Sequence, residues 1–175
     1  MRTVIHLRHA ERATDGIHLS DRGRSQAADI ARSVPRFDRV VTSPKPRAVE
    51  TAEAMGQPPN GRLPILGEIP TAVLRTIDRD PPGSFADYLA LGSRNAAART
   101  YAAAAAEAIA REIDRVPDPG RLLVVSHAGV VELSAVGAIG PAAADWGPTV
   151  SPLEGVELVY DQHRWQHGTV VRRPP

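Results

Sequence analysis

Four basic or imidazole side chains stand where short apolar stretches of this sequence end. Arg8 and His9 follow the first stretch, Arg47 follows the second within the segment SPKPR, and His127 follows a third. Guanidinium groups match the oxygens of a phosphoryl group and stay charged. An imidazole can act as a nucleophile or hydrogen-bond donor near neutral pH. These residue types indicate a phosphate site, provided that the fold brings them together.

The three apolar stretches read as strands because they are short and rich in β-branched and aliphatic residues. They cover residues 3–7, 39–42 and 121–125, and PIL at 64–66 is a further candidate. Helical spacing of apolar residues, caps and strong helix formers predict helices between them. The expected helices cover residues 20–34, 43–55 (Ser43 as cap, Pro44 in the first turn), 94–116 and 130–139, and a closing hairpin covers 155–160 and 164–171.

This alternation of strand and helix predicts an α/β fold, a three-layer sandwich with a mainly parallel central sheet flanked by helices. Ligands bind such sheets outside the carboxyl ends of the strands. Arg8, His9, Arg47 and His127 all follow strand ends, so we expect them to converge at one edge. The helix that begins near Pro44 would direct its positive dipole end toward the same place.

Composition narrows the class of protein. The 175 residues suit one domain, and 42% apolar residues suffice for a core. A net charge of +1 gives no electrostatic reason to expect nucleic acid or a membrane as partner. The chain has no cysteine, which excludes disulfides and thiolate chemistry. We see no signal peptide or membrane span, so we expect a cytoplasmic protein; its oligomeric state is left open.

Five segments, in order along nearly the whole chain, match the motifs of one family. They are RHA at 8–10, HLSDRGRSQA at 18–27, VVTSPKPRAVETA at 40–52, VVSHAGVV at 124–131 and SPLEGVELVY at 151–160. With these motifs the sequence resembles the histidine phosphatase superfamily, also called the phosphoglycerate-mutase-like or RHG-motif family, in its short bacterial phosphatase type. Ala10 stands where the family usually has Gly.

The resemblance implies phosphoryl transfer through a phosphohistidine. His9 would attack phosphorus while neutral, with its other ring nitrogen held by a backbone carbonyl. Arg8 and Arg47 would clamp the phosphoryl oxygens, and His127, cationic once phosphate is bound, would donate to the developing charge. Water would then release phosphate from phospho-His9. No metal or other cofactor is implied, and no residues suggest a metal site.

An acidic residue must protonate the leaving oxygen, and the family often carries it in a segment of the form L.E. Leu66-Gly67-Glu68 fits this spacing, which makes Glu68 the candidate general acid and later the base for water. The following G.WEG of the family is missing, and Asp78, Asp80 and Asp87 are rivals. Asp15 stands where many members have Asn, and we expect its carboxylate to point away from phosphate.

We therefore expect a metal-independent phosphatase, a phosphoric monoester hydrolase acting on small metabolites. Residues 57–93 form one possible small lid or specificity segment within a single domain of residues 1–175. This segment is too short for a large cap, which disfavours a mutase with a closed pocket. Two alternatives stay open: a protein phosphohistidine phosphatase acting on a phosphoprotein, and a non-catalytic phosphate-binding or scaffold protein of the same fold.

Overall fold

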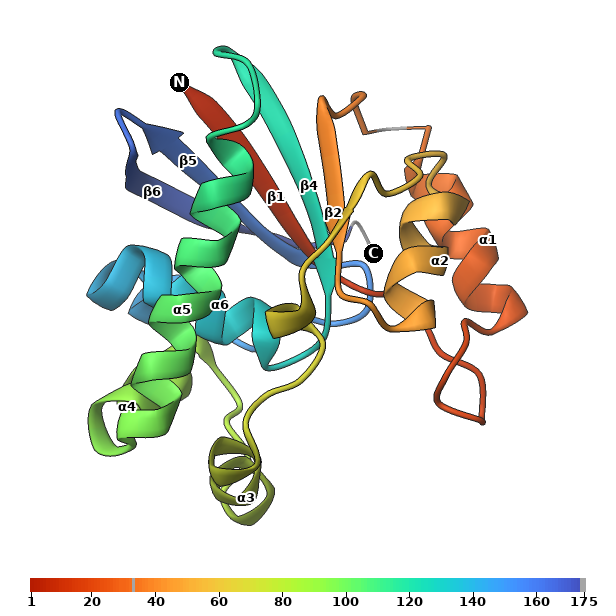
Figure 1. Cartoon of the computed structure of the whole chain (residues 1–175). Helices are drawn as coiled ribbons and strands as arrows, with labels where there is room; N and C mark the ends of the chain where they lie inside the picture. The colour runs from red at the N-terminus through yellow and green to blue at the C-terminus, as the bar shows by residue number, and fades with distance from the viewer. Residues whose placement is uncertain (33, 174–175) are drawn as a thin grey trace.

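The computed structural model describes residues 1–32 and 34–173, and within them one sheet runs through the middle of the molecule (Figure 1). Its strand order is β3-β2-β4-β1-β5-β6. The strands are β1 (Arg2–Arg8), β2 (Arg39–Thr42), β3 (Gly61–Arg62), β4 (Gly120–Ser126), β5 (Gly155–Asp161) and β6 (Arg164–Val171). The pairs among β1 to β4 are parallel, and β5 and β6 add an antiparallel hairpin at one edge.

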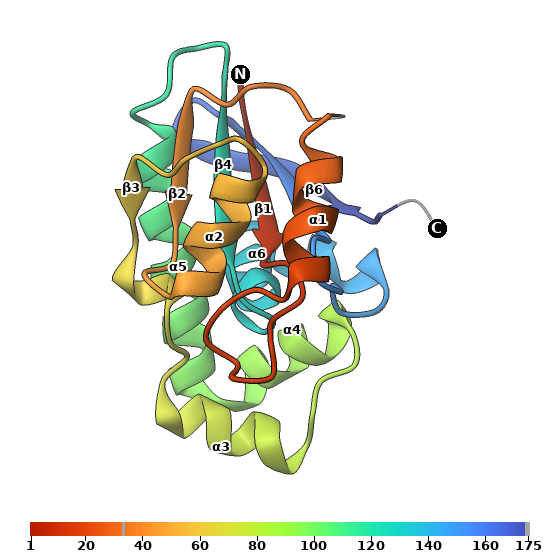
Figure 2. The same cartoon turned by 90° about the vertical axis from the view of Figure 1, so that its right-hand side faces the viewer.

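Helices cover both faces of this sheet. Helices α1 (Asp21–Ile30) and α2 (Pro46–Ala54) lie on one face, and α5 (Ala96–Ile113) and α6 (Val130–Ile139) lie on the other (Figures 1 and 2). Helix α4 (Phe85–Arg94) packs against α5 and α6. Helix α3 (Thr71–Arg79) and the loop between β1 and α1 lie at the carboxyl end of the parallel strands (Figure 2). The predicted three-layer α/β sandwich with a mainly parallel sheet is confirmed.

Side chains that alternate along the central strand β4 form two separate cores. Leu122 and Val124 belong to the core under α5 and α6, whereas Leu123 and Val125 belong to the core under α1 and α2. All four are fully buried. A strand that is covered on both faces needs no polar alternation, which explains the continuous apolar run RLLVV.

The segment before α5 differs from the expected elements. Residues 64–66 form a short 3-10 helix instead of a strand, and they are followed by α3 and α4, which were not among the expected helices. Helix α3 fully buries only Val73, and Ile77 packs partly buried against the same core, so its nine residues give a short apolar stripe that the sequence analysis did not identify. The long helix expected from Arg94 begins at residue 96, because the Asn95 side chain caps it by accepting from Ala98 N at 3.0 Å.

Helix α2 begins two residues later than expected. Lys45 is its N-cap residue and Pro46 is its first residue, so the prediction that Ser43 caps this helix is wrong. The Ser43 hydroxyl instead lies 2.7 Å from His127 Nε2 and accepts from Lys45 N at 3.3 Å. Ser43, which resembles a helix cap in the sequence, thus contacts the His127 imidazole at the end of the neighbouring strand β4.

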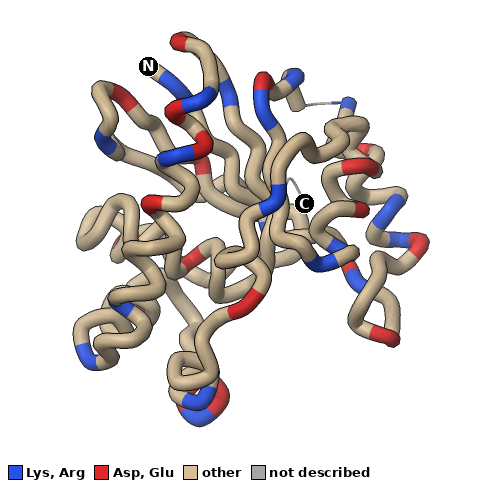
Figure 3. Tube along the Cα trace, in the orientation of Figure 1, with Lys and Arg blue, Asp and Glu red and all other residues tan. Residues whose placement is uncertain are grey.

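Acidic and basic residues are interspersed over the chain, in keeping with the net charge of +1 (Figure 3). None of the helices in the described part of the chain combines the length and apolar character that crossing a membrane would require.

The close packing of α5 against α6 gives a first prediction. A Cβ at Gly137 would lie 2.1 Å from the Ala102 carbonyl oxygen, so Gly137→Ala must push the two helices apart. We expect a loss of about 1–3 kcal/mol in the free energy of unfolding. Gly92→Ala in α4 is the matched control, because nothing lies within 4 Å of its added Cβ. It should gain about 0.5–1 kcal/mol from helix propensity. Urea unfolding measures both, and equal stability of the two variants would contradict the packing argument.

Candidate active site

Strands β1, β2 and β4 end at the same edge, and hydrogen bonds continue their pairing one residue further. Arg8 is in register with Ser126. Beyond the strands, His9 N donates to Ser126 O and Ser43 N donates to Val125 O, both at 2.9 Å. The residues directly after three strands are therefore fixed side by side by backbone bonds alone, as expected for the carboxyl edge of a parallel sheet.

The His9 ring is buried, and its tautomer is set by a backbone carbonyl. Nδ1 lies 2.6 Å from Ala10 O, which can only accept, so Nδ1 carries the proton and Nε2 presents a lone pair. Arg47 Nε donates to this Nε2 at 3.2 Å. Burial is the main cause that lowers the pKa of His9 to about 4, and the charges of Arg47 and Arg8 add to it. The ring is therefore a neutral nucleophile at pH 7.

The His127 ring faces His9 edge-on, with ring centroids 5.2 Å apart and planes at 61°. Its Nε2 contacts the Ser43 hydroxyl, while its buried Nδ1 has no hydrogen-bond partner among residues 1–32 and 34–173. Burial, followed by the charge of Arg47, lowers the pKa of His127 to about 2. The ring is neutral without a ligand, and a bound dianion would favour the cationic form expected from the sequence.

The two arginines are each held by a backbone carbonyl from a different loop. Arg8 Nη1 donates to Val150 O at 2.9 Å, and its buried Nε finds no hydrogen-bond partner in the described part of the chain. Arg47 Nη1 donates to Gly16 O at 3.1 Å. Burial lowers the pKa of both guanidiniums, and each remains a cation near neutral pH. Their anchoring leaves further donors for a ligand.

Arg8, His9, Arg47 and His127 line one hollow of about 410 Å³. The structure therefore brings together four of the five predicted site residues. A second hollow of about 360 Å³ shares Arg47 and His127 with the first and extends toward α3. Polar groups line both hollows, and the second offers room beside the first for the remainder of a ligand.

Glu68, the fifth predicted site residue, lies apart from this cluster. It lines the second hollow, its side chain is 82% exposed, and Oε1 is 3.5 Å from Lys45 Nζ. The carboxylate thus stands at the rim, next to the pocket wall formed by Arg47 and His127. Its assignment as general acid stays a prediction.

Thr51 of α2 links the backbone next to His9 with the backbone of Arg47. Its Oγ1 accepts from Ala10 N at 3.0 Å and donates to Arg47 O at 2.7 Å. Ala10 is the residue whose carbonyl fixes the His9 tautomer. One buried hydroxyl therefore sets the spacing between Ala10, the residue after His9, and the start of α2.

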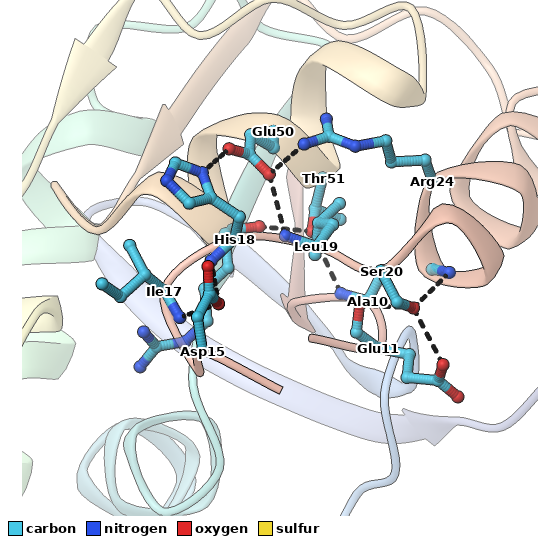
Figure 4. A network of polar contacts seen from close by, with 12 residues as sticks. Ala10, Glu11, Asp15, Ile17, His18, Leu19, Ser20, Arg24, Glu50 and Thr51 are labelled. Carbon is cyan, nitrogen blue, oxygen red and sulfur yellow. Dashed lines mark hydrogen bonds and ion pairs between the residues drawn. The ribbon is translucent and has the colours of Figure 1, made fainter. Parts of the chain in front are cut away.

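Glu50 holds the loop between β1 and α1 onto α2 (Figure 4). Its carboxylate lies 2.5 Å from His18 Nδ1 and accepts from Leu19 N at 2.9 Å and Arg24 Nη2 at 2.8 Å. Within the loop, Asp15 Oδ1 accepts from the backbone N–H groups of residues 17 and 18. Asp15 therefore folds the loop that supplies the Gly16 carbonyl to Arg47, and it does not line either of the two hollows.

Arg12 lines the first hollow and was missed by the sequence analysis. It is exposed and pairs by an isolated bridge with Leu19, and its charge contributes to lowering the pKa values of His9 and Arg47. The available signal was a second arginine four residues after Arg8 in the same loop. Glu11 beside it also lines the hollow, with Oε1 accepting from the Ser20 hydroxyl at 2.8 Å.

The arrangement can bind a small dianion against a nucleophilic nitrogen. Arg8, Arg47 and His127 line the same hollow as the neutral His9 ring, and Arg47 Nε donates to its Nε2. Such a cradle supplies positioning and electrostatic stabilisation, which are what phosphoryl transfer requires. Among residues 1–32 and 34–173, no three His, Asp or Glu side chains are grouped as ligands for a metal ion.

Comparison with known proteins agrees with this geometry. The family model described as histidine phosphatase superfamily (branch 1) matches residues 5–171. No curated protein sequence is significantly similar to the chain.

Solved structures show the same fold. A phosphoserine phosphatase from Entamoeba histolytica, in complex with 3-phosphoglyceric acid, superimposes with a TM-score of 0.69 at 17% identity, covering 97% of this chain and 95% of that one. A putative alpha-ribazole-5'-P phosphatase from Escherichia coli superimposes with a TM-score of 0.64 at 21% identity, and the match covers 98% of each chain. A phosphoglycerate mutase from Bacillus anthracis superimposes with a TM-score of 0.68 at 14% identity, and the match covers 96% of this chain and 92% of that one. The predicted phosphoglycerate-mutase-like fold is confirmed.

The buried imidazoles predict a pH dependence of stability. Burial lowers the pKa of His6 to about 3, of His9 to about 4 and of His127 to about 2. In the unfolded chain these rings take up protons near pH 6.5, whereas the folded chain does not until far lower pH. The free energy of unfolding should therefore fall as pH drops from 6.5 to 4, by up to about 1.4 kcal/mol per pH unit for each ring. Urea unfolding at pH 7.0 and 5.5 checks this, and equal stability at both would contradict it.

Proposed function

This chain belongs to the histidine phosphatase superfamily (branch 1), and we propose that it is a metal-independent phosphatase that hydrolyses phosphomonoesters of small metabolites through a phosphohistidine on His9. The observation that carries the proposal is the state of His9. Its Nδ1 proton is held by Ala10 O, and its Nε2 lone pair lies in a hollow shared with Arg8, Arg47 and His127.

The first half-reaction follows from these positions. The phosphoryl group enters the hollow and takes over the donor that Arg47 Nε directs at His9. Arg8 and His127, which line the hollow and each keep one nitrogen without a hydrogen-bond partner among the described residues, offer donors to its oxygens. His9 Nε2 then attacks phosphorus, the bond to the ester oxygen breaks, and the electron pair leaves with that oxygen. Fixed cations stabilise the charge of the transition state.

The second half-reaction transfers the phosphoryl group to water. Glu68 protonates the departing oxygen in the first step and afterwards accepts a proton from the attacking water. Its place at the rim of the second hollow supports this role, because that hollow adjoins the cluster through Arg47 and His127. The products are an alcohol and inorganic phosphate, and the neutral His9 is restored.

The second hollow also supports a small substrate. Residues 57–93, proposed as the specificity segment, contribute Glu68, Ile69 and Leu74 to its wall. An apolar flank and a Lys45–Glu68 ion pair would meet the alcohol portion of the ester. Two of the similar structures described above are phosphatases of small phosphorylated molecules by name, which points the same way.

Replacement of the nucleophile tests the mechanism. His9→Ala should lower kcat/KM for an aryl phosphate by at least about 10³-fold, because the covalent route is removed. Wild-type activity should persist in the presence of a chelator. The control is His163→Ala, a side chain that is 79% exposed and bonded to Asp114 on the surface, which should retain full activity. A phosphate-release assay over a panel of metabolites and a phosphohistidine peptide provides the measurement.

Each alternative has its own outcome in this assay. Equal turnover by wild type and His9→Ala would reject the phosphohistidine. Activity on the phosphohistidine peptide alone would make the chain a protein phosphatase, and phosphate binding without any turnover would make it a non-catalytic phosphate-binding or scaffold protein.

The leaving group decides whether Glu68 is the general acid. An acid matters most when the departing alcohol is basic, so Glu68→Gln should lower kcat/KM for an alkyl phosphate by about 10²-fold or more. The same variant should change the rate for p-nitrophenyl phosphate little, because nitrophenolate leaves without a proton. Asp78→Asn, a rival carboxylate on the exposed side of α3, serves as the comparison. Equal losses on both substrates would remove Glu68 from this role.

A further inference from the structure

Glu132 in the first turn of α6 is a carboxylate with no solvent exposure. A charge in such a place is costly unless hydrogen bonds compensate for it. Its two oxygens accept from two separate backbone segments: Oε2 from Gly129 N at 2.7 Å and Oε1 from Val150 N at 3.0 Å. Both segments border the candidate active site, and none of the steps described above uses Glu132.

The first of these bonds is explained by the helix alone. Gly129 precedes α6, and a glutamate three residues later commonly accepts from this N–H at a helix start. Gly129 also lies two residues after His127, and its φ of +79° turns the chain from β4 into α6. The bond therefore also fixes the turn that follows the second imidazole.

The second bond has no role in capping α6. Val150 lies 18 residues further along the chain, in the loop before β5. The same residue offers its carbonyl to Arg8 Nη1 at 2.9 Å. The Val150 N–H thus donates to the buried Glu132 carboxylate, while the Val150 carbonyl accepts from the Arg8 guanidinium.

Charge supports the same connection. Burial lowers the pKa of Arg8, and the charge of Glu132 opposes that shift. In turn burial raises the pKa of Glu132, while the Val150 and Gly129 N–H bonds and the charge of Arg8 act against it. The carboxylate and the guanidinium stabilise each other in the interior without direct contact, with the Val150 backbone between them.

We propose that Glu132 is a positioning residue of the active site, which fixes the Arg8 guanidinium through Val150 and the His127 turn through Gly129. The inference rests on the proposed function, because it assigns these two side chains to phosphoryl binding. A single buried carboxylate would then set the distance between two groups that come from different strands. A shift of about 1 Å in such a constellation can cost about 100-fold in rate.

The test compares two buried glutamates. Glu132→Gln leaves one oxygen to accept, so an amide NH₂ must face either Gly129 N or Val150 N. Glu112→Gln is the matched control, since Glu112 is 6% exposed on α5 and bonds Arg39 and Arg115 away from the site. Glu132→Gln should lower kcat/KM for an aryl phosphate by about 10- to 100-fold and raise the inhibition constant of inorganic phosphate about 10-fold. Glu112→Gln should change both less than 2-fold.

The readouts separate positioning from folding. A purely structural role would lower the stability of Glu132→Gln while leaving the phosphate inhibition constant of its folded fraction unchanged, and that result overturns the proposal. If Glu132→Gln does not fold, hydrogen exchange of the wild-type protein provides the test. Orthovanadate should slow exchange at the Gly129 and Val150 amides more than at core amides of α5, and equal slowing would overturn the inference.

Failure of the proposed function gives a different result. A wild-type protein that hydrolyses no phosphomonoester contradicts the phosphatase assignment itself. An active wild type whose Glu132→Gln variant behaves like Glu112→Gln contradicts only the role of Glu132.

Discussion

Like charges have to be held together at this site, and the parallel pairing of β1, β2 and β4 is the constraint that makes this possible. Arg8, Arg47 and Arg12 all lower the pKa of His9, which means that the cations disfavour further positive charge there. Backbone bonds from His9 N and Ser43 N to β4 keep the strand ends adjacent despite this repulsion. The stability of the sheet therefore keeps several positive charges close together, and a bound anion would neutralise them.

Around this edge, buried polar groups fix distances that the sheet leaves free. Thr51 joins Ala10 to the start of α2, Ser43 orients His127, and Glu132 joins two loops from the other side. Each accepts from or donates to backbone or ring atoms rather than solvent. Buried polar networks of this kind specify one geometry because an unmade bond in the interior is costly. The rim of the second hollow, by contrast, carries exposed side chains such as Glu68, whose carboxylate pairs only with Lys45 among the ion pairs of the described residues.

The amino-acid sequence by itself determined the layers and most of the site. Alternating strands and helices predicted the sandwich, and four residues that follow strand ends, Arg8, His9, Arg47 and His127, do line one hollow. This worked because the rule that places ligands at the carboxyl edge depends on chain order alone. The order of the five motifs along the chain likewise indicated the family, which the match of the family model to residues 5–171 confirms.

Only the tertiary structure decided the rest, because it depends on partners that are distant in the chain. Ser43 reads as a cap until His127, 84 residues away, takes its hydroxyl. Helix α3 spans only nine residues and fully buries one of them, so its short apolar pattern was not decisive in the sequence. Glu132 reads as half of a capping box until Val150 and Arg8 are in view. Local sequence patterns reflect interactions between residues that are close in the sequence, whereas buried polar groups often form hydrogen bonds with residues that are distant in the sequence and close only in the fold.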